Sequence, residues 1–145
     1  MKKRIDLSTV VSSAYKRVIA LDSFVQNSGL NKAHIELIKI RASQVNGCAY
    51  CLNLHTRDAI TQGESMQRIF LLNAWRETEL FTEEERVILA MTEEITLISH
   101  AGLSDQTYEM ATKVFNEEYI GLIIMAIITI NAWNRIAIST NKPLD

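Results

Sequence analysis

Apolar residues recur every three to four positions along most of the chain, which is the spacing that places them on one face of a helix. The alternation of apolar and polar residues that is typical of strands is not evident in the sequence. Proline occurs once and glycine five times, so few residues interrupt the helical pattern. It predicts helices over about residues 8–26, 32–45, 48–62, 65–76, 83–98, 105–115 and 117–138. We therefore expect an all-α fold, a single-domain bundle of about six to seven helices spanning residues 1–145.

Several side chains are suited to the ends of these helices. Asn31 and Asn116 each precede a predicted helix, where a side-chain oxygen can accept hydrogen bonds from unpaired backbone N–H groups. Thr82 and Glu85 have the spacing of a capping box. Gly29 can adopt the left-handed conformation that ends a helix. These residues predict where several of the helices begin or end.

The last predicted helix is apolar on more than one face. A helix of this kind forms the core of the fold or lies partly in a subunit interface. Its most apolar run, residues 119–132, is short and is interrupted by Gly121, Thr129 and Asn131. We therefore do not expect it to span a membrane.

Composition and charge narrow the class of protein. Apolar residues make up 48% of the chain and charged residues 22%, which is ordinary for a globular domain. The net charge of -2 gives no reason to expect nucleic acid or an acidic membrane as a partner. Residues 1–4 are basic, but polar residues at 12, 13, 16 and 17 interrupt any apolar segment behind them, so we expect no signal peptide. We expect a cytoplasmic protein, in which a cysteine pair indicates redox chemistry or metal binding.

The candidate chemistry lies in residues 46–55, which hold both cysteines and one of the three histidines. In a helix that starts near Cys48, residues Cys51 and His55 share its face. A helix N-terminus favours thiolates, and an imidazole one turn further on can take up the thiol proton. Glu36 lies in an apolar stretch, where a carboxylate needs a partner, and it could orient that imidazole. A second cysteine lets an oxidised thiol resolve as a disulfide.

The same residues occur in other kinds of site. A thioredoxin-like Cys-x-x-Cys follows a strand, and none is predicted here. A c-type haem site requires histidine directly after the second cysteine, where this chain has Leu52. Two buried cysteines could also serve only as small apolar residues. A zinc ion could take three ligands from the motif, Cys48, Cys51 and His55, and a fourth from His34, Glu36 or His100. The second pair of closely spaced ligands that zinc sites usually have is missing. Spacing alone leaves the redox, zinc and structural readings open.

The motif resembles that of a known family. Glu36 followed by Cys48-x-x-Cys51-x-x-x-His55 is similar to the core motif of the alkyl hydroperoxidase D-like (AhpD-like) family, within the carboxymuconolactone decarboxylase-like superfamily. Three further segments are similar to small single-domain members, namely residues 41–51, 74–77 and 130–135. The resemblance therefore covers about residues 10 to 138.

The resemblance implies a set of roles. Cys51 would attack the peroxide, Cys48 would resolve the product as a disulfide, and His55 and Glu36 would relay the proton. It also implies an all-α homo-oligomer, a trimer or hexamer, that binds no cofactor and is reduced by an external dithiol on a dihydrolipoamide-bearing partner. Tyr50 departs from the pattern, because the peroxidase type has histidine there and a phenol cannot act as a base at neutral pH.

Two functions follow from these observations. The first is a thiol-dependent alkyl hydroperoxide reductase or dithiol–disulfide oxidoreductase. The second, motivated by Tyr50, is a redox-responsive or structural oligomer without efficient peroxidase turnover. Decarboxylation is disfavoured, because the lactone decarboxylases of the superfamily typically lack the cysteine pair. The choice of attacking thiol is also open, since on helix-dipole grounds alone Cys48 would be the better thiolate.

Overall fold

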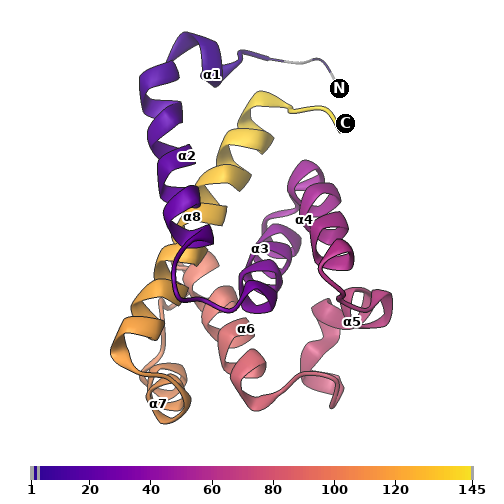
Figure 1. Ribbon diagram of the computed structural model, residues 1–145, viewed down its shortest axis with the longest axis vertical. Helices are drawn as coiled ribbons and strands as arrows, with labels where there is room; N and C mark the ends of the chain where they lie inside the picture. The colour runs from indigo at the N-terminus through magenta and orange to yellow at the C-terminus, as the bar shows by residue number, and fades with distance from the viewer. Residues whose placement is uncertain (1, 3, 145) are drawn as a thin grey trace.

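The computed structural model describes residues 2 and 4–144, so Met1 and Lys3 of the basic N-terminal segment lie outside the described residues. The described part of the chain is all-α and contains no strand, which confirms the predicted fold class (Figure 1). The helices are α1 (Leu7–Val10), α2 (Ser12–Gln26), α3 (Lys32–Asn46), α4 (Ala49–Thr61), α5 (Met66–Leu71), the 3-10 helix η1 (Leu72–Glu77), α6 (Glu83–Thr96), α7 (Asp105–Val114) and α8 (Glu117–Thr140).

Two of the predicted helices are each divided in two, so the described residues form more helices than expected. The backbone at Val11 leaves the helical region, with φ −136° and ψ 49°, and separates α1 from α2. The predicted helix over residues 65–76 becomes α5 followed by η1, in which Ala74 is not helical. The side chain of Trp75 donates to Glu93 on α6 at 2.8 Å. Periodicity cannot detect such breaks, because the apolar spacing continues through them.

Helix α3 lies at the centre of the fold and packs against α4, α6 and α8 (Figure 1). Helix α2 packs against α8, and α7 packs against α6. The core between these helices consists of aliphatic side chains with almost no exposed surface, among them Ile35, Ile38, Ile88, Ile123, Ile127 and Ile130. Burying each such side chain contributes about 1.5–3 kcal/mol relative to leaving it exposed. This packing fixes α3, which carries Glu36 of the predicted site.

The ends of the helices agree with most of the cap predictions. Asn31 accepts from the N–H of Ala33, and Thr82 and Glu85 form the predicted capping box. Gly29 is an exception, because α2 ends at Gln26, three residues earlier, and Gly29 does not have a positive φ. The amide group of Asn27 instead donates to the carbonyl of Ser23. The predicted left-handed cap at Gly29 is therefore wrong.

Helix α8 is longer than the apolar run suggested. It has 24 residues and contains an 18-residue stretch with a mean hydropathy of 1.6, so by length and composition alone it could cross a membrane. The core helix of a soluble protein meets the same criteria, and α8 packs against α2, α3 and α6 with polar Thr129 and Asn134 fully buried. The length of α8 is therefore weak evidence for a membrane location.

Two side chains of the segment 74–77 donate hydrogen bonds to a carboxylate on α6. Glu93 accepts hydrogen bonds from Arg41, Trp75 and Arg76 at 2.8, 2.8 and 2.5 Å. Burial by itself would raise the pKa of Glu93, but the hydrogen bonds from Trp75, Arg76 and Arg41 outweigh burial and lower that pKa. Because the pKa of Glu93 is lower in the folded state, its ionised form stabilises the fold at pH values above the ordinary glutamate pKa of 4.5. This stabilisation is lost as the pH falls through the pKa that Glu93 has in the folded protein.

Replacing Glu93 with glutamine is expected to lower the free energy of unfolding at neutral pH by about 1–3 kcal/mol, because the amide cannot satisfy three donors. The variant should also lose less stability than the parent when the pH falls below 4.5. Denaturant unfolding at several pH values measures both effects. Exposed Glu109→Gln on α7 is the control and should leave the pH dependence unchanged. Equal acid sensitivity of parent and Glu93→Gln would contradict the assignment.

Candidate active site

The cysteine pair is positioned by a sharp turn between α3 and α4. Gly47 lies in the left-handed region, with φ 67° and ψ 35°, and ends α3. The backbone N–H of Cys48 then donates to the carbonyl of Ser43 at 3.0 Å. Cys48 is the N-cap of α4, and its sulfur accepts from the N–H of Cys51 at 3.4 Å. The prediction that a helix begins near Cys48 is thus confirmed.

The importance of the left-handed backbone at Gly47 can be tested with two alanine substitutions, one at Gly47 and one at Gly29. A Cβ at Gly47 or at Gly29 would meet no atom within 4 Å, so the two positions differ in backbone conformation and not in available space. Gly47→Ala is expected to destabilise the protein by about 1–2 kcal/mol, because an L-residue is strained at positive φ. Gly29→Ala should be neutral or stabilising by up to about 1 kcal/mol. Thermal unfolding measures both, and equal stability of the two variants would contradict this account.

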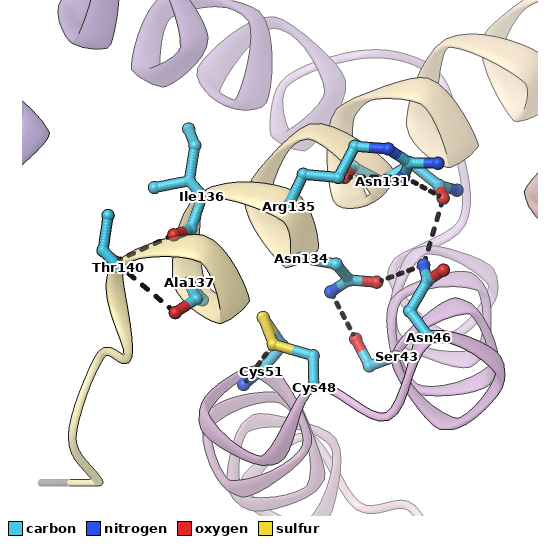
Figure 2. Close-up of a disulfide and its surroundings, with 10 residues drawn as sticks. All are labelled: Ser43, Asn46, Cys48, Cys51, Asn131, Asn134, Arg135, Ile136, Ala137 and Thr140. Atoms are coloured by element: carbon cyan, nitrogen blue, oxygen red, sulfur yellow. Dashed lines mark hydrogen bonds between the residues drawn. A yellow bond between two sulfur atoms is a disulfide. The ribbon is translucent and has the colours of Figure 1, made fainter. Parts of the chain in front are cut away.

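The two cysteines are joined as a disulfide in the structure, with their Cα atoms 5.4 Å apart. Both residues are buried, at 1% and 2% exposure for Cys48 and Cys51. Figure 2 shows the disulfide between the first turn of α4 and the part of α8 that carries Asn134 and Ala137. Cys51 also lines a cavity of about 200 Å³, whereas Cys48 is not among its lining residues. Cys51, and not Cys48, is therefore the sulfur that a molecule in this cavity would meet.

His55 and Glu36 meet across two helices. The Nδ1 atom of His55 lies 3.2 Å from Oε2 of Glu36, and both side chains are more than nine-tenths buried. The contact has the distance of an ion pair but not the alignment of a hydrogen bond, and neither atom has another hydrogen-bond partner among the described residues. Catalytic contacts are often poorly aligned before substrate binds. A proton on Nδ1 directed at Glu36 would leave Nε2 free to act as a base.

The predicted residues therefore come together. Cys51 and His55 are one turn apart on α4 and line the same cavity. Glu36 on α3 contacts His55 but is not among the residues that line this cavity. Tyr50 lines this cavity as well, and the Nζ atom of Lys142 lies 4.2 Å from the centre of its ring. Asp58 is a further neighbour that the sequence reasoning missed, with Oδ2 3.9 Å from Nδ1 of His55.

The zinc set that the spacing left open does not assemble around the cysteines. Nδ1 of His34 lies 2.8 Å from the hydroxyl of Tyr119, and burial lowers the pKa of this histidine. His100 lies in the exposed turn after α6. Within the described residues, the side chains whose ligand atoms converge are Glu36, His55 and Asp58, without either cysteine.

An amide network supports the turn that carries Cys48. The side-chain amide of Asn46 donates to the oxygens of Asn131 and Asn134 at 3.0 and 2.8 Å. Asn134 in turn donates to the hydroxyl of Ser43 at 3.0 Å (Figure 2). These contacts tie the last turn of α3 to α8 and explain why asparagines recur in the segment 130–135.

The cavity beside Cys51 contains residues for which the motif gave no signal. Its walls are mainly aromatic and aliphatic, formed by Tyr15, Tyr50, Leu54, Trp133, Ile136 and Ala137. Its charged residues include Asp22 and Lys39, whose Oδ1 and Nζ atoms are 3.1 Å apart. Lys39 lies between Ile38 and Ile40, three residues after Glu36, and this apolar setting is the one sequence feature that marks it as unusual.

Comparisons with known proteins agree with this fold and motif. Residues 13–94 match the model of the carboxymuconolactone decarboxylase family. An uncharacterised protein of Bacillus subtilis (strain 168), YdfG, is 37% identical over 139 residues, which are 96% of this chain and 95% of that protein. A protein of unknown function from Agrobacterium tumefaciens, which has been proposed to be the antioxidant defence protein AhpD, is 40% identical in its crystal structure. Its TM-score is 0.96, and the match covers 99% of both chains.

A more distant structure shares the fold alone. The debrominase Bmp8 has a TM-score of 0.77 and 18% identity over 92% of this chain and 70% of its own. The fold and the cysteine pair define an all-α protein with a Cys-x-x-Cys motif at a helix start. The chain belongs to the carboxymuconolactone decarboxylase family, and within that superfamily it is an AhpD-like member.

Proposed function

We propose that the protein is a cytoplasmic thiol-dependent hydroperoxide reductase that uses Cys51, Cys48, His55 and Glu36. The observation that carries the proposal is the buried contact of 3.2 Å between His55 on α4 and Glu36 on α3. Cys51, one turn before His55 on α4, lines the same cavity as His55. A nucleophile, a base and a group that orients the base form the arrangement that activates a thiol. The similar protein from Agrobacterium tumefaciens, proposed to act in antioxidant defence, supports the same function.

The oxidative half of the reaction uses a proton that His55 takes from the Cys51 thiol. The thiolate attacks the outer oxygen of a hydroperoxide, an S–O bond forms and the O–O bond breaks. The leaving alkoxide takes the proton from His55 and departs as an alcohol, and Cys51 becomes a sulfenic acid. Cys48 then attacks the sulfur of Cys51, so that a disulfide forms and hydroxide leaves with the Cys48 proton as water.

The reductive half requires an external dithiol, and the protein itself holds no cofactor in this scheme. The dithiol attacks the disulfide, supplies two electrons and two protons, and is itself oxidised to a disulfide. We place a dihydrolipoamide-bearing protein in this role. Steady-state consumption of cumene hydroperoxide with dihydrolipoamide as the reductant tests the complete cycle.

A second candidate is a redox-responsive or structural oligomer. Both cysteines are almost completely buried, and Tyr50 replaces the histidine of the peroxidase type, which favours slow exchange of the disulfide. Such a protein would be oxidised once and would not turn over when peroxide and dithiol are both supplied. Sustained turnover in the assay above would exclude this candidate, and one equivalent consumed without further reaction would favour it.

The proposal includes a homo-oligomer, a trimer or hexamer. The segment that holds α1 and α2 exposes several large apolar side chains, and α2 buries only Val25. The exposed residues include Val10, Val11, Ile19 and Phe24. Exposed apolar surface of this kind is typical of a protein–protein interface. Light scattering coupled to gel filtration measures the mass of the assembly.

A further inference from the structure

The cavity beside Cys51 has a charged end that the proposed thiol chemistry does not use. Lys39 on α3 is 3% exposed, and the carboxylate that approaches its ammonium group is Asp22 on α2, at 3.1 Å. Lys39 is buried, whereas 29% of the Asp22 side chain is exposed. Burying a lysine is costly, and an apolar residue of similar volume is often equally stable in such a place. The pair therefore requires a reason beyond packing.

The ion pair does not saturate the ammonium group. A lysine offers three N–H donors, and a single carboxylate at ion-pair distance engages only part of them. Oδ1 of Asp22 has no aligned hydrogen bond among the described residues, so the two groups are close without being locked together. Lys39 lines the same cavity as Cys51 and His55, so its donors can serve a ligand there.

The remaining walls indicate the rest of the ligand. Tyr15 and Trp133 lie edge to face with their ring centres 5.3 Å apart, and Ile136 lines the cavity beside them. The volume of about 200 Å³ is several times the roughly 30 Å³ that one water molecule takes in the liquid. Hydrogen peroxide would leave most of this space unfilled, whereas a small organic molecule would fill it.

We propose that this cavity is a binding site for small organic acids, with the carboxylate of the ligand on Lys39 and its apolar body against Tyr15, Trp133 and Ile136. An ammonium–carboxylate hydrogen bond is charge-assisted and roughly twice as strong as a neutral one. Asp22 competes with the ligand for Lys39 and holds the lysine in place when the site is empty. Binding of an organic acid here does not depend on the proposed function. One further point rests on that function, namely that the substrates are organic hydroperoxides that bear a carboxylate.

The test uses binding, so that it does not depend on turnover. Benzoate and benzamide are similar in shape and differ in charge, and titration of the oxidised protein by calorimetry or NMR gives the affinity of each. Benzoate is expected to bind the parent protein about tenfold more tightly than benzamide. Lys39→Met should abolish this preference, and Lys113→Met, an exposed lysine on α7, should leave it unchanged.

Asp22→Asn keeps the lysine and removes its competitor, so it serves even if Lys39→Met does not fold. It is expected to raise the affinity for benzoate several-fold and to leave that for benzamide unchanged. A purely structural ion pair would give the opposite result, with binding of benzoate unchanged or weakened. Equal affinities of the parent for the two probes, or a preference that survives in Lys39→Met, would also overturn the proposal.

The two proposals fail in different ways. If benzoate binds as expected but peroxide does not oxidise the reduced protein, the acid site stands and the peroxidase function falls. If the reduced protein consumes cumene hydroperoxide but benzoate does not bind, the function stands and the acid site falls.

Discussion

Replacing Cys51 with serine is expected to lower kcat/KM for organic hydroperoxides by roughly 10⁴-fold or more, since loss of a nucleophile removes the step that all others depend on. Cys51 lines the cavity that also contains His55, so it is the sulfur that a substrate there would meet. Peroxide consumption with saturating dithiol measures the loss. Cys48→Ser is the matched control, because it keeps the attacking thiol and removes the resolving one.

The two cysteine variants should differ in their products. Cys48→Ser is expected to react once with peroxide and to stop at a sulfenic acid on Cys51, which a dimedone-type reagent traps. Cys51→Ser should give no such adduct. The reverse pattern would contradict the assignment and would identify Cys48 as the nucleophile. That outcome has a physical basis, because the N–H of Cys51 points at the Cys48 sulfur and would stabilise a thiolate there.

Glu36→Gln is expected to lower kcat/KM by roughly 10²-fold, which is the scale of a general acid–base contribution. The carboxylate oxygen lies 3.2 Å from Nδ1 of His55. A neutral amide would not stabilise an imidazolium by charge, and it could present its NH2 group to that nitrogen as readily as its oxygen. The rate of thiol oxidation by peroxide in a stopped-flow measurement isolates this step from reduction by the dithiol.

Asp58→Asn is the matched control for Glu36→Gln. Asp58 also faces Nδ1 of His55, but at 3.9 Å and with 47% of its side chain exposed. Solvent screens an exposed charge, so this variant should change the rate by less than about threefold. If Asp58→Asn slowed thiol oxidation as much as Glu36→Gln, the special role of the buried carboxylate would be wrong.

The sequence predicted the parts of this site that depend on helical spacing. Cys51 and His55 are four residues apart, so any helix through them places both on one face. An apolar environment around Glu36 indicated that the carboxylate has a buried partner. That this partner is His55 was a hypothesis from the residue types, which the family motif supported and periodicity could not establish, because the contact joins two helices.

The parts that the sequence did not predict depend on tertiary contacts. Gly29 and Gly47 both follow a predicted helix, but the left-handed turn occurs at Gly47, where the backbone N–H of Cys48 returns to the carbonyl of Ser43. Lys39 has the sequence character of a charged helix residue, which is normally exposed. Its burial follows from tertiary contacts, among them the ion pair with Asp22 on α2, and no local pattern contains those contacts.

The central claim is that Cys51 and Cys48 pass together from two thiols to a disulfide when one hydroperoxide molecule is reduced. Thiol titration with intact mass, before and after one equivalent of cumene hydroperoxide and again after dihydrolipoamide, tests it most directly. We predict rapid loss of two thiols and two hydrogen atoms, fully reversed by the dithiol. Thiols that stay unreacted towards the peroxide would contradict the claim.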